Sequence, residues 1–222
     1  MTIDTRTTGQ IRIVEAREEH IPFIAWVELA AARSHLPLGV WDLYTNQPEE
    51  ETLRFLERLC ATDAPHFGHY RNFIVAEVDG TPAAALSGYF EAQLGMGKLL
   101  VAMDEVNNAL GRTAEENQAG WERAGSITLC DIQHVPDAWI VEWVATAPGF
   151  RRRGLVDRMM AEILDIGRAK GASTADIGVL IDNDAAQRAY EKNGFVVVDE
   201  KRHPQFEADY GCPGVRLLRR SI

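Results

Sequence analysis

The chain has 222 residues, of which 46% are hydrophobic and 25% are charged, and its formal net charge is -10 at pH 7. This composition is typical of a globular protein with enough apolar material for a sizeable core, so the fold requires no disulfide or metal. The acidic balance argues against nucleic acid and anionic membranes as partners, because both carry the same sign of charge.

Cysteine usage and the N-terminal segment favour a cytoplasmic protein. The three cysteines form no CxxC pair, and their odd number argues against a disulfide framework; they are Cys60, Cys130 and Cys212. Residues 1–10 are polar and lack the apolar stretch of a secretory signal. No uninterrupted apolar run reaches the roughly 18 residues of a membrane span.

The first half of the chain predicts a strand, two helices and a hairpin. These elements are expected over residues 10–17, over 18–33, from Pro48 onward, and over 72–78 and 81–90 around the turn Asp79–Gly80. The second helix has a Glu-rich first turn, which suits the positive end of the helix dipole. Between the two helices we expect a long loop with aromatic residues, over 34–47.

The second half of the chain predicts strands that alternate with helices. A helical insertion on the surface of the sheet is expected over about 95–136, with helices over 101–110 and 113–125. The elements that follow are a central strand over 139–146, an amphipathic helix over 155–170, a strand over 175–181, a helix over 184–192, and strands over 195–200 and 214–218. The pattern as a whole indicates a mixed α/β sheet.

A basic turn follows the strand over 139–146. It contains the consecutive arginines Arg151, Arg152 and Arg153, and the next helix begins at about Gly154. The first amides of a helix lack internal partners and point outward, which suits phosphate oxygens, and glycine lets a phosphate approach the backbone. On charge alone, a solvated basic turn explains these residues as well. The turn has neither a P-loop ending nor a GxGxxG pattern.

A second group of polar residues follows the strand over 175–181. Asn183 stands where this strand gives way to a helix, which is an N-cap position. Tyr190 lies about two helical turns further along, on the same face. A structural role explains each residue equally well, Asn183 as a cap and Tyr190 as a packed aromatic side chain.

The two motifs together resemble those of the GNAT superfamily of acyl-CoA-dependent N-acetyltransferases. The pyrophosphate loop of that family reads Gln/Arg-x-x-Gly-x-Gly/Ala, and this chain has RRRGLV over 151–156. The later family pattern, N-x-x-A-x-x-x-Y-x-x-x-G-F, is matched by NDAAQRAYEKNGF over 183–195. The resemblance covers residues 139–200. It implies one α/β domain over 1–222, with a mixed, mostly antiparallel sheet flanked by helices and a helical insertion before the central coenzyme-binding strand.

The resemblance also implies acetyl-CoA as the co-substrate and no metal. In this family the pantetheine arm inserts beside a splayed strand like an added strand, and the pyrophosphate lies against the loop amides. The residues implied to bind the coenzyme are Val144, Ala145, Thr146, Arg151, Arg152, Arg153, Gly154, Leu155, Val156, Asn183 and Tyr190. Val156 departs from the family pattern, which has Gly or Ala there, and adds bulk at the first turn of the helix.

Acetyl transfer to an amine needs a base, because only the neutral amine attacks the thioester. Glu142 is the one charged residue in the apolar run 139–146, and it shares strand parity with Val144 and Thr146. Desolvation in such a strand would raise the pKa of Glu142, which suits a base. An ion pair with a neighbouring arginine, or exposure to water where the strand splays, explains Glu142 equally well.

The resemblance gives Tyr190 the role of general acid, which protonates the leaving thiolate. Acceptor determinants in this family come from the loop between the first two helices and from insertions. Here they would include Trp41, Asp42, Tyr44 and Trp121, although aromatic residues in such loops also serve as packing anchors. His66 and His69 show HxxH spacing without a third ligand, so we expect no metal site.

These observations favour an N-acetyltransferase that moves an acetyl group from acetyl-CoA to a primary amine by direct attack in a ternary complex. The acceptor is a small-molecule or peptide amine, and the acidic surface favours a cationic one. Because dimers are common in the family, a homodimer is compatible with the resemblance. The main alternative is a catalytically silent acyl-CoA-binding regulatory domain. A small-anion or nucleotide-binding module ranks last, because it leaves residues 183–195 unexplained.

Overall fold

A seven-stranded sheet is the centre of the fold. The computed structural model describes residues 9–222, so most of the polar N-terminal segment lies outside the described residues. The strand order is β1-β2-β3-β4-β5-β7-β6. The strands are β1 (Ile11–Glu15), β2 (Phe73–Val78), β3 (Thr81–Phe90), β4 (Trp139–Thr146), β5 (Thr174–Leu180), β6 (Val196–Arg202) and β7 (Gly214–Ser221). Within residues 9–222 every neighbouring pair is antiparallel except β4 and β5, which confirms the predicted mixed, mostly antiparallel sheet.

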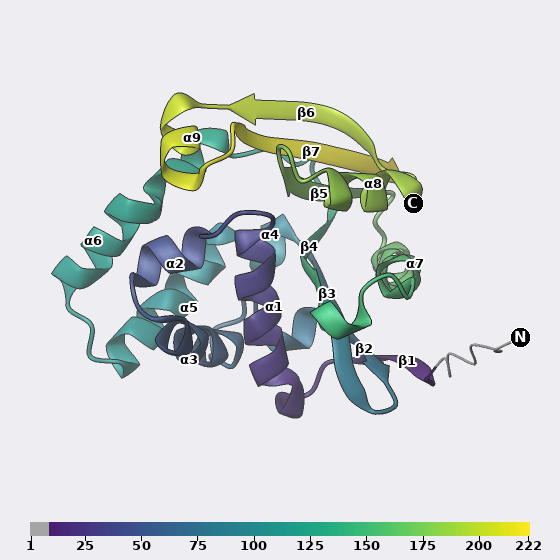
Figure 1. Ribbon diagram of the computed structural model, residues 1–222, viewed down its shortest axis with the longest axis horizontal. Helices are drawn as coiled ribbons and strands as arrows, with labels where there is room; N and C mark the ends of the chain where they lie inside the picture. Colours follow the sequence, from purple (N-terminus) through teal and green to yellow (C-terminus); the bar gives the residue numbers. More distant parts are fainter. Residues whose placement is uncertain (1–8) are drawn as a thin grey trace, which may run out of the picture.

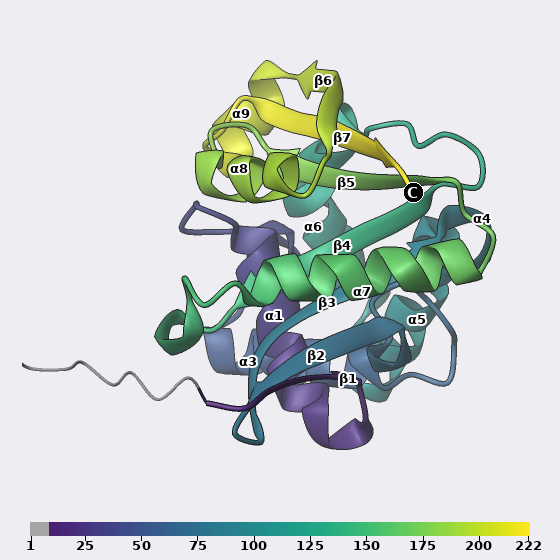
Figure 2. The same cartoon turned by 90° about the vertical axis from the view of Figure 1, so that its right-hand side faces the viewer.

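Helices cover both faces of this sheet (Figure 1). One face carries α7 (Leu155–Ala169) and α8 (Asp184–Lys192), and Figure 2 looks onto α7 as it lies across the strands. The other face carries α1 (Ile21–Arg33), α2 (Val40–Thr45), α3 (Glu49–Cys60), α5 (Met96–Ala109) and α6 (Ala114–Ala124). Two further short helices are α4 (Glu91–Leu94) and α9 (Pro204–Tyr210). Within the described part of the chain, no helix has the length and apolar character needed to cross a membrane.

The loop predicted over 34–47 contains a short helix instead, α2. Its N-terminus is fixed by Asp42, whose side chain accepts a hydrogen bond of 2.9 Å from the Gly39 amide. The Arg33 guanidinium holds the same carboxylate with two hydrogen bonds of 2.7 and 3.0 Å. A helix of six residues is too short for periodicity to predict, because its stability comes from these side-chain contacts rather than from an apolar stripe.

The segment over 95–136 is more than a surface insertion. Helix α5 begins at Met96, earlier than predicted, and buries Leu99, Met103 and Val106 in a core shared with Tyr89 of β3 and Ile140 of β4. Helix α6 begins with the capping box formed by Thr113 and Glu116. The segment therefore supplies part of the hydrophobic core on this face of the sheet.

Trp139 at the start of β4 fixes the distance between the sheet and α7. Its indole ring is 2% exposed and lies between Gly88 of β3 and Gly167 of α7. A Cβ atom added at Gly88 or Gly167 would lie 2.5 or 2.6 Å from the ring, respectively. Glycine is therefore required at both positions for the helix and the strands to approach this closely.

The substitution Gly167→Ala tests this packing. The added methyl group would overlap the Trp139 ring, so we expect the free energy of unfolding to fall by about 1–2 kcal/mol, net of the helix-propensity gain. Gly97→Ala in α5 is the matched control, because a Cβ atom there meets nothing within 4 Å. It should raise the free energy of unfolding by up to about 1 kcal/mol. Urea unfolding measures both, and equal stabilities would contradict the close contact at Trp139.

Candidate active site

A cleft opens where β4 and β5 separate. The two parallel strands pair only through residues 139–141 of β4 and 175–177 of β5. Beyond this point β4 continues along β3 to Thr146, and β5 continues along β7 to Leu180. The facing backbone edges are thus free to hydrogen-bond to an extended ligand. The cleft has a volume of about 1200 Å³ and is lined by residues of both strands.

A β-bulge at Trp143 decides which side chains of β4 face α1 and α2 and which face α7. The register shift between β3 and β4 leaves two residues of β4 opposite one of β3. Trp143 has a φ of 54°, a left-handed conformation that is uncommon for a large residue. The extra residue puts Glu142 on the face of Tyr89, whereas Val144 packs into the core beneath α7. The predicted parity of Glu142 with Val144 is therefore wrong, because the apolar run carries no signal of the bulge.

Glu142 is held by a tyrosine rather than by an arginine. The Tyr89 hydroxyl donates a hydrogen bond of 2.8 Å to the Glu142 carboxylate. Burial raises the pKa of Glu142 to about 7, although the Tyr89 hydrogen bond and the nearby His134 both act to lower it. Burial also raises the pKa of Tyr89, so the phenol keeps its proton and remains a donor. Glu142 can thus gain or lose a proton near neutral pH, as a general base must.

The basic turn presents a run of backbone amides to an anion. Gly154, the N-cap of α7, has a φ of 71°, and Arg152 has a φ of 63°. Among the hydrogen bonds of residues 9–222, none uses an amide of residues 152–157 as its donor. Left-handed residues next to a helix N-terminus aim such amides at one point, which is a common way to bind phosphate groups. The residues present therefore fit a pyrophosphate.

The predicted coenzyme residues differ in their access to the cleft. Those that line it are Val144, Ala145, Thr146, Arg151, Arg152, Val156, Asn183 and Tyr190. The side chain of Leu155 is instead buried in the core beneath α7. The exposed Arg153 guanidinium lies 5.2 Å from the centre of the Phe150 ring. At Gly154 and Leu155 only the backbone is therefore positioned to contact a ligand.

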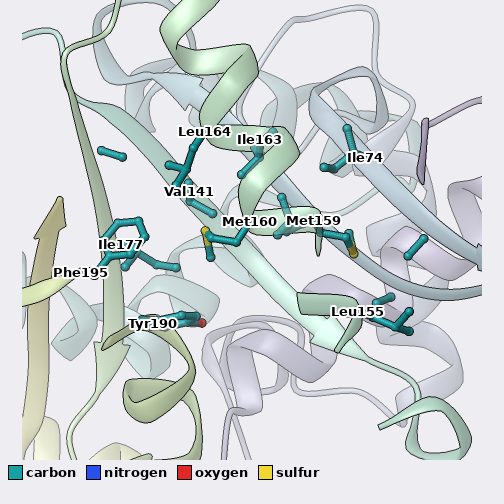
Figure 3. Close-up of a cluster of buried hydrophobic side chains, with 14 of the residues drawn as sticks. Ile74, Val141, Leu155, Met159, Met160, Ile163, Leu164, Ile177, Tyr190 and Phe195 are labelled. Carbon is teal, nitrogen blue, oxygen red and sulfur yellow. The ribbon is translucent and has the colours of Figure 1, made fainter. Parts of the chain in front are cut away.

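Asn183 and Tyr190 line the cleft from the α8 wall. The Asn183 side chain caps α8 by accepting from the Ala186 amide at 3.1 Å, and it donates to the Ser34 hydroxyl at 2.6 Å. Tyr190 lies at the rim of the hydrophobic cluster beneath α7 (Figure 3). Burial raises the pKa of Tyr190, so its hydroxyl is protonated at neutral pH. Asn183 is thus a helix cap and Tyr190 a packed aromatic side chain, and both also line the cleft.

Trp41 and Tyr44 form part of the cleft wall opposite the sheet, and both are deeply packed. They are 3% and 1% exposed, respectively. The ring centres of Trp41 and Trp143 lie 6.0 Å apart, and the Tyr44 hydroxyl accepts a hydrogen bond of 2.8 Å from Asn107. These contacts are those of packing anchors. Because both residues belong to the cleft wall, they also determine the shape of that wall. Trp121, 5.0 Å from the Tyr44 ring, lines the same wall.

His66 and His69 make local hydrogen bonds. The His66 ring nitrogens contact the Leu59 carbonyl oxygen at 2.9 Å and the Gly68 amide at 3.1 Å. Burial lowers the pKa of His66 to about 4, so its ring is neutral. Over residues 9–222, no group of three or more His, Cys, Asp or Glu side chains is placed to hold a metal ion.

The sequence model of the acetyltransferase (GNAT) family matches residues 38–195. The chain belongs to this family. An acetyltransferase of known crystal structure superposes with a TM-score of 0.70 at 18% identity, over 95% of this chain and 99% of the other. An N-acetyltransferase from Staphylococcus aureus Mu50 gives a TM-score of 0.69 at 21% identity, over 94% and 100%. The PaiA N-acetyltransferase from Thermoplasma acidophilum, solved in complex with coenzyme A, gives 0.50 at 14% identity, over 96% and 99%.

None of the curated proteins matches this chain. The likeness to the solved structures confirms the predicted GNAT fold class, with seven strands flanked by helices. In this GNAT protein, sequence reasoning missed Tyr89, because the residue belongs to the hairpin and meets Glu142 only through the pairing of β3 with β4. Only the register between β3 and β4 would have identified Tyr89 as the partner of Glu142.

The substitution Tyr89→Phe tests the environment of Glu142. The Tyr89 hydrogen bond stabilises the ionised carboxylate, so its loss should raise the pKa of Glu142 above about 7. Titration of the carboxyl carbon by NMR, in protein labelled with ¹³C at glutamate, measures this shift directly. Tyr70→Phe, on a residue that packs in a separate core cluster, is the control and should leave the Glu142 titration unchanged. An unaltered Glu142 pKa in Tyr89→Phe would contradict the role of the hydrogen bond.

Proposed function

We propose that this GNAT protein transfers an acetyl group from acetyl-CoA to a primary amine by direct attack in a ternary complex. One observation carries the proposal: residues of the basic turn and the partly buried carboxyl of Glu142 line the same cleft. Because Glu142 has a pKa of about 7, a base is present in the cleft. An anion site and a base in one cleft are the two groups that acyl transfer from a coenzyme to an amine requires.

At the end of the cleft proposed to hold the coenzyme, backbone groups would make most of the contacts. The amides of residues 152–157 would hold the pyrophosphate, with the Arg151 and Arg152 guanidinium groups close by. The unpaired edge of β4 over 144–146 would hydrogen-bond to the amides of the pantetheine arm, as a strand does. Val156 is only partly buried and lines the cleft, so its side chain limits how deeply the pyrophosphate sits.

Each step of the transfer has a candidate residue. Glu142 takes a proton from the ammonium form of the acceptor, and the freed nitrogen lone pair attacks the thioester carbonyl carbon. An unpaired amide on the edge of β4 stabilises the oxyanion of the tetrahedral intermediate. When the carbon–sulfur bond breaks, the Tyr190 hydroxyl donates a proton to the departing thiolate. The nitrogen gives up its second proton as the amide forms, and the Tyr190 phenolate takes a proton back from solvent.

The acceptor end of the cleft favours a cationic amine with an apolar body. The aromatic side chains that line it include Trp41, Tyr89 and Trp143, and the carboxyl groups of Glu91 and Glu142 line it as well. Aromatic faces attract cations, and the carboxylates add a favourable field. A primary ammonium group on a hydrophobic or aromatic skeleton fits this combination.

Thermal unfolding with and without acetyl-CoA tests the coenzyme site. Ligand at 100 times its Kd should stabilise the protein by roughly 2.7 kcal/mol and raise the Tm. Arg151→Ala should weaken this shift, because it removes a charge beside the loop amides. The control is Arg168→Ala, near the C-terminal end of α7 and away from the basic turn, which should retain the full shift. No shift in the wild type with acetyl-CoA or CoA would exclude the proposed function.

The substitution Tyr190→Phe tests the general acid. It removes the proton donor but keeps the buried ring, so we expect kcat to fall about 100-fold with little change in the Kd for acetyl-CoA. Steady-state rates on a panel of primary amines, together with calorimetric binding, separate the two effects. Equal turnover in the two proteins would eliminate the role of Tyr190. Binding of acetyl-CoA by a wild type that acetylates no amine would favour a silent coenzyme-binding domain.

A further inference from the structure

A buried acidic side chain, Asp176, lies on the same face of the sheet as Glu142. The pairing of four strands puts Tyr89, Ile140, Asp176 and Arg219 in one row across β3, β4, β5 and β7. Glu142 follows Ile140 by two residues, before the bulge, and therefore points to the same face. Asp176, opposite Ile140 in the row, points to this face as well and is 0% exposed.

Asp176 is held as a carboxylate by an arginine fork. Arg219 donates two hydrogen bonds to it, of 2.7 and 2.8 Å, one to each oxygen. Burial acts to raise the pKa of Asp176, but the hydrogen bonds from Arg219 and His134 more than offset this, and the pKa is lowered. An ionised carboxylate can only accept hydrogen bonds.

This carboxylate fixes the orientation and tautomer of His134. The His134 Nδ1 atom lies 3.0 Å from Asp176 Oδ2, and because the carboxylate only accepts, Nδ1 carries the proton. In the neutral ring the lone pair is then on Nε2, for which the hydrogen bonds of residues 9–222 include no partner. His134 lines the cleft, and its side chain is 20% exposed. In a histidine that acts as a base, a carboxylate commonly fixes one ring nitrogen, and the other ring nitrogen accepts the proton.

His134 and Glu142 both line the cleft. The other ionisable groups around this end are Glu28, Tyr89, Glu91, Asp131, Asp176 and Arg219. The Tyr89 hydroxyl is engaged as the hydrogen-bond donor to Glu142, and Asp176 is engaged by Arg219 and His134.

We propose that His134, oriented by Asp176 and Arg219, is a second proton acceptor of the active site, with Nε2 as the accepting atom. The inference rests on the proposed acetyl transfer. The acceptor ammonium gives one proton to the Glu142 carboxylate before the attack, and its nitrogen has to lose a second proton as the amide forms. The Nε2 atom of His134 accepts this second proton. The resulting imidazolium is paired with Asp176 and then releases the proton to solvent.

The position of His134 also explains what the segment over 95–136 contributes to the site. Residues 131–138 return from that segment to β4 without regular structure and carry His134 over the edge of β5. Gly178 follows Asp176 by two residues on the same strand face, and a Cβ atom there would come 3.3 Å from Ile132. The glycine thus gives the segment room to lie against β5.

Chemical rescue tests the proposal. The variant His134→Ala should lose about 100-fold in kcat, and added imidazole should restore much of that loss, because the small base occupies the vacated space. The control is His203→Ala at the N-terminus of α9, whose rate should be normal and insensitive to imidazole. Full activity in His134→Ala, or a loss that imidazole does not restore, would overturn the proposal.

A second variant separates the base from the contact with Asp176. His134→Gln keeps an N–H group for Asp176 but has no basic nitrogen, so its kcat should fall as far as that of His134→Ala while its Tm stays at the wild-type value. A wild-type kcat in His134→Gln would overturn the proposal. Failure of acetyl transfer itself is recognised separately, by a wild type that binds no acetyl-CoA or acetylates no amine.

Discussion

The separation of β4 from β5 is the constraint on which the site depends. Two parallel strands that pair for three residues and then part leave backbone hydrogen-bonding groups without partners, which is costly unless a ligand or water satisfies them. The strands can part because each keeps its other neighbour, β3 for β4 and β7 for β5. The gap is therefore a property of the sheet and is present before any ligand arrives. A preformed edge of this kind spares the ordering cost that a flexible binding segment would incur.

Each face of the sheet has a different task. Beneath α7, the core formed around Trp139, Met159 and Met160 anchors the helix that begins at the basic turn. On the opposite face, the core around Tyr44, Phe55 and Met103 supports the cleft wall. Because of the bulge at Trp143, Glu142 points to this second face while Val144 packs beneath α7. In the proposed acetyl transfer, one strand thereby contacts the two substrates from opposite sides.

The sequence predicted the parts of this design that are local. The strand–turn–helix around Arg151 and the segment from Asn183 to Phe195 are contiguous motifs, and the helices and strands around them follow from apolar periodicity. The bulge, the Tyr89–Glu142 hydrogen bond and the His134–Asp176 pair all depend on which strands are neighbours. No pattern within a single segment encodes such pairings. Helix α2 was missed for a related reason, because a salt bridge from α1 stabilises it.

The core role of helix α5 has a consequence for how the protein could be shortened. A surface insertion, as the sequence predicts over about 95–136, is a segment that could be cut out to shorten the chain. Its apolar side chains, however, cover Tyr89 and Ile140, and its last residues position His134 beside Asp176. Excision would uncover an apolar sheet face in the wall of the cleft and promote aggregation. The segment and the sheet therefore have to be expressed and engineered as one unit.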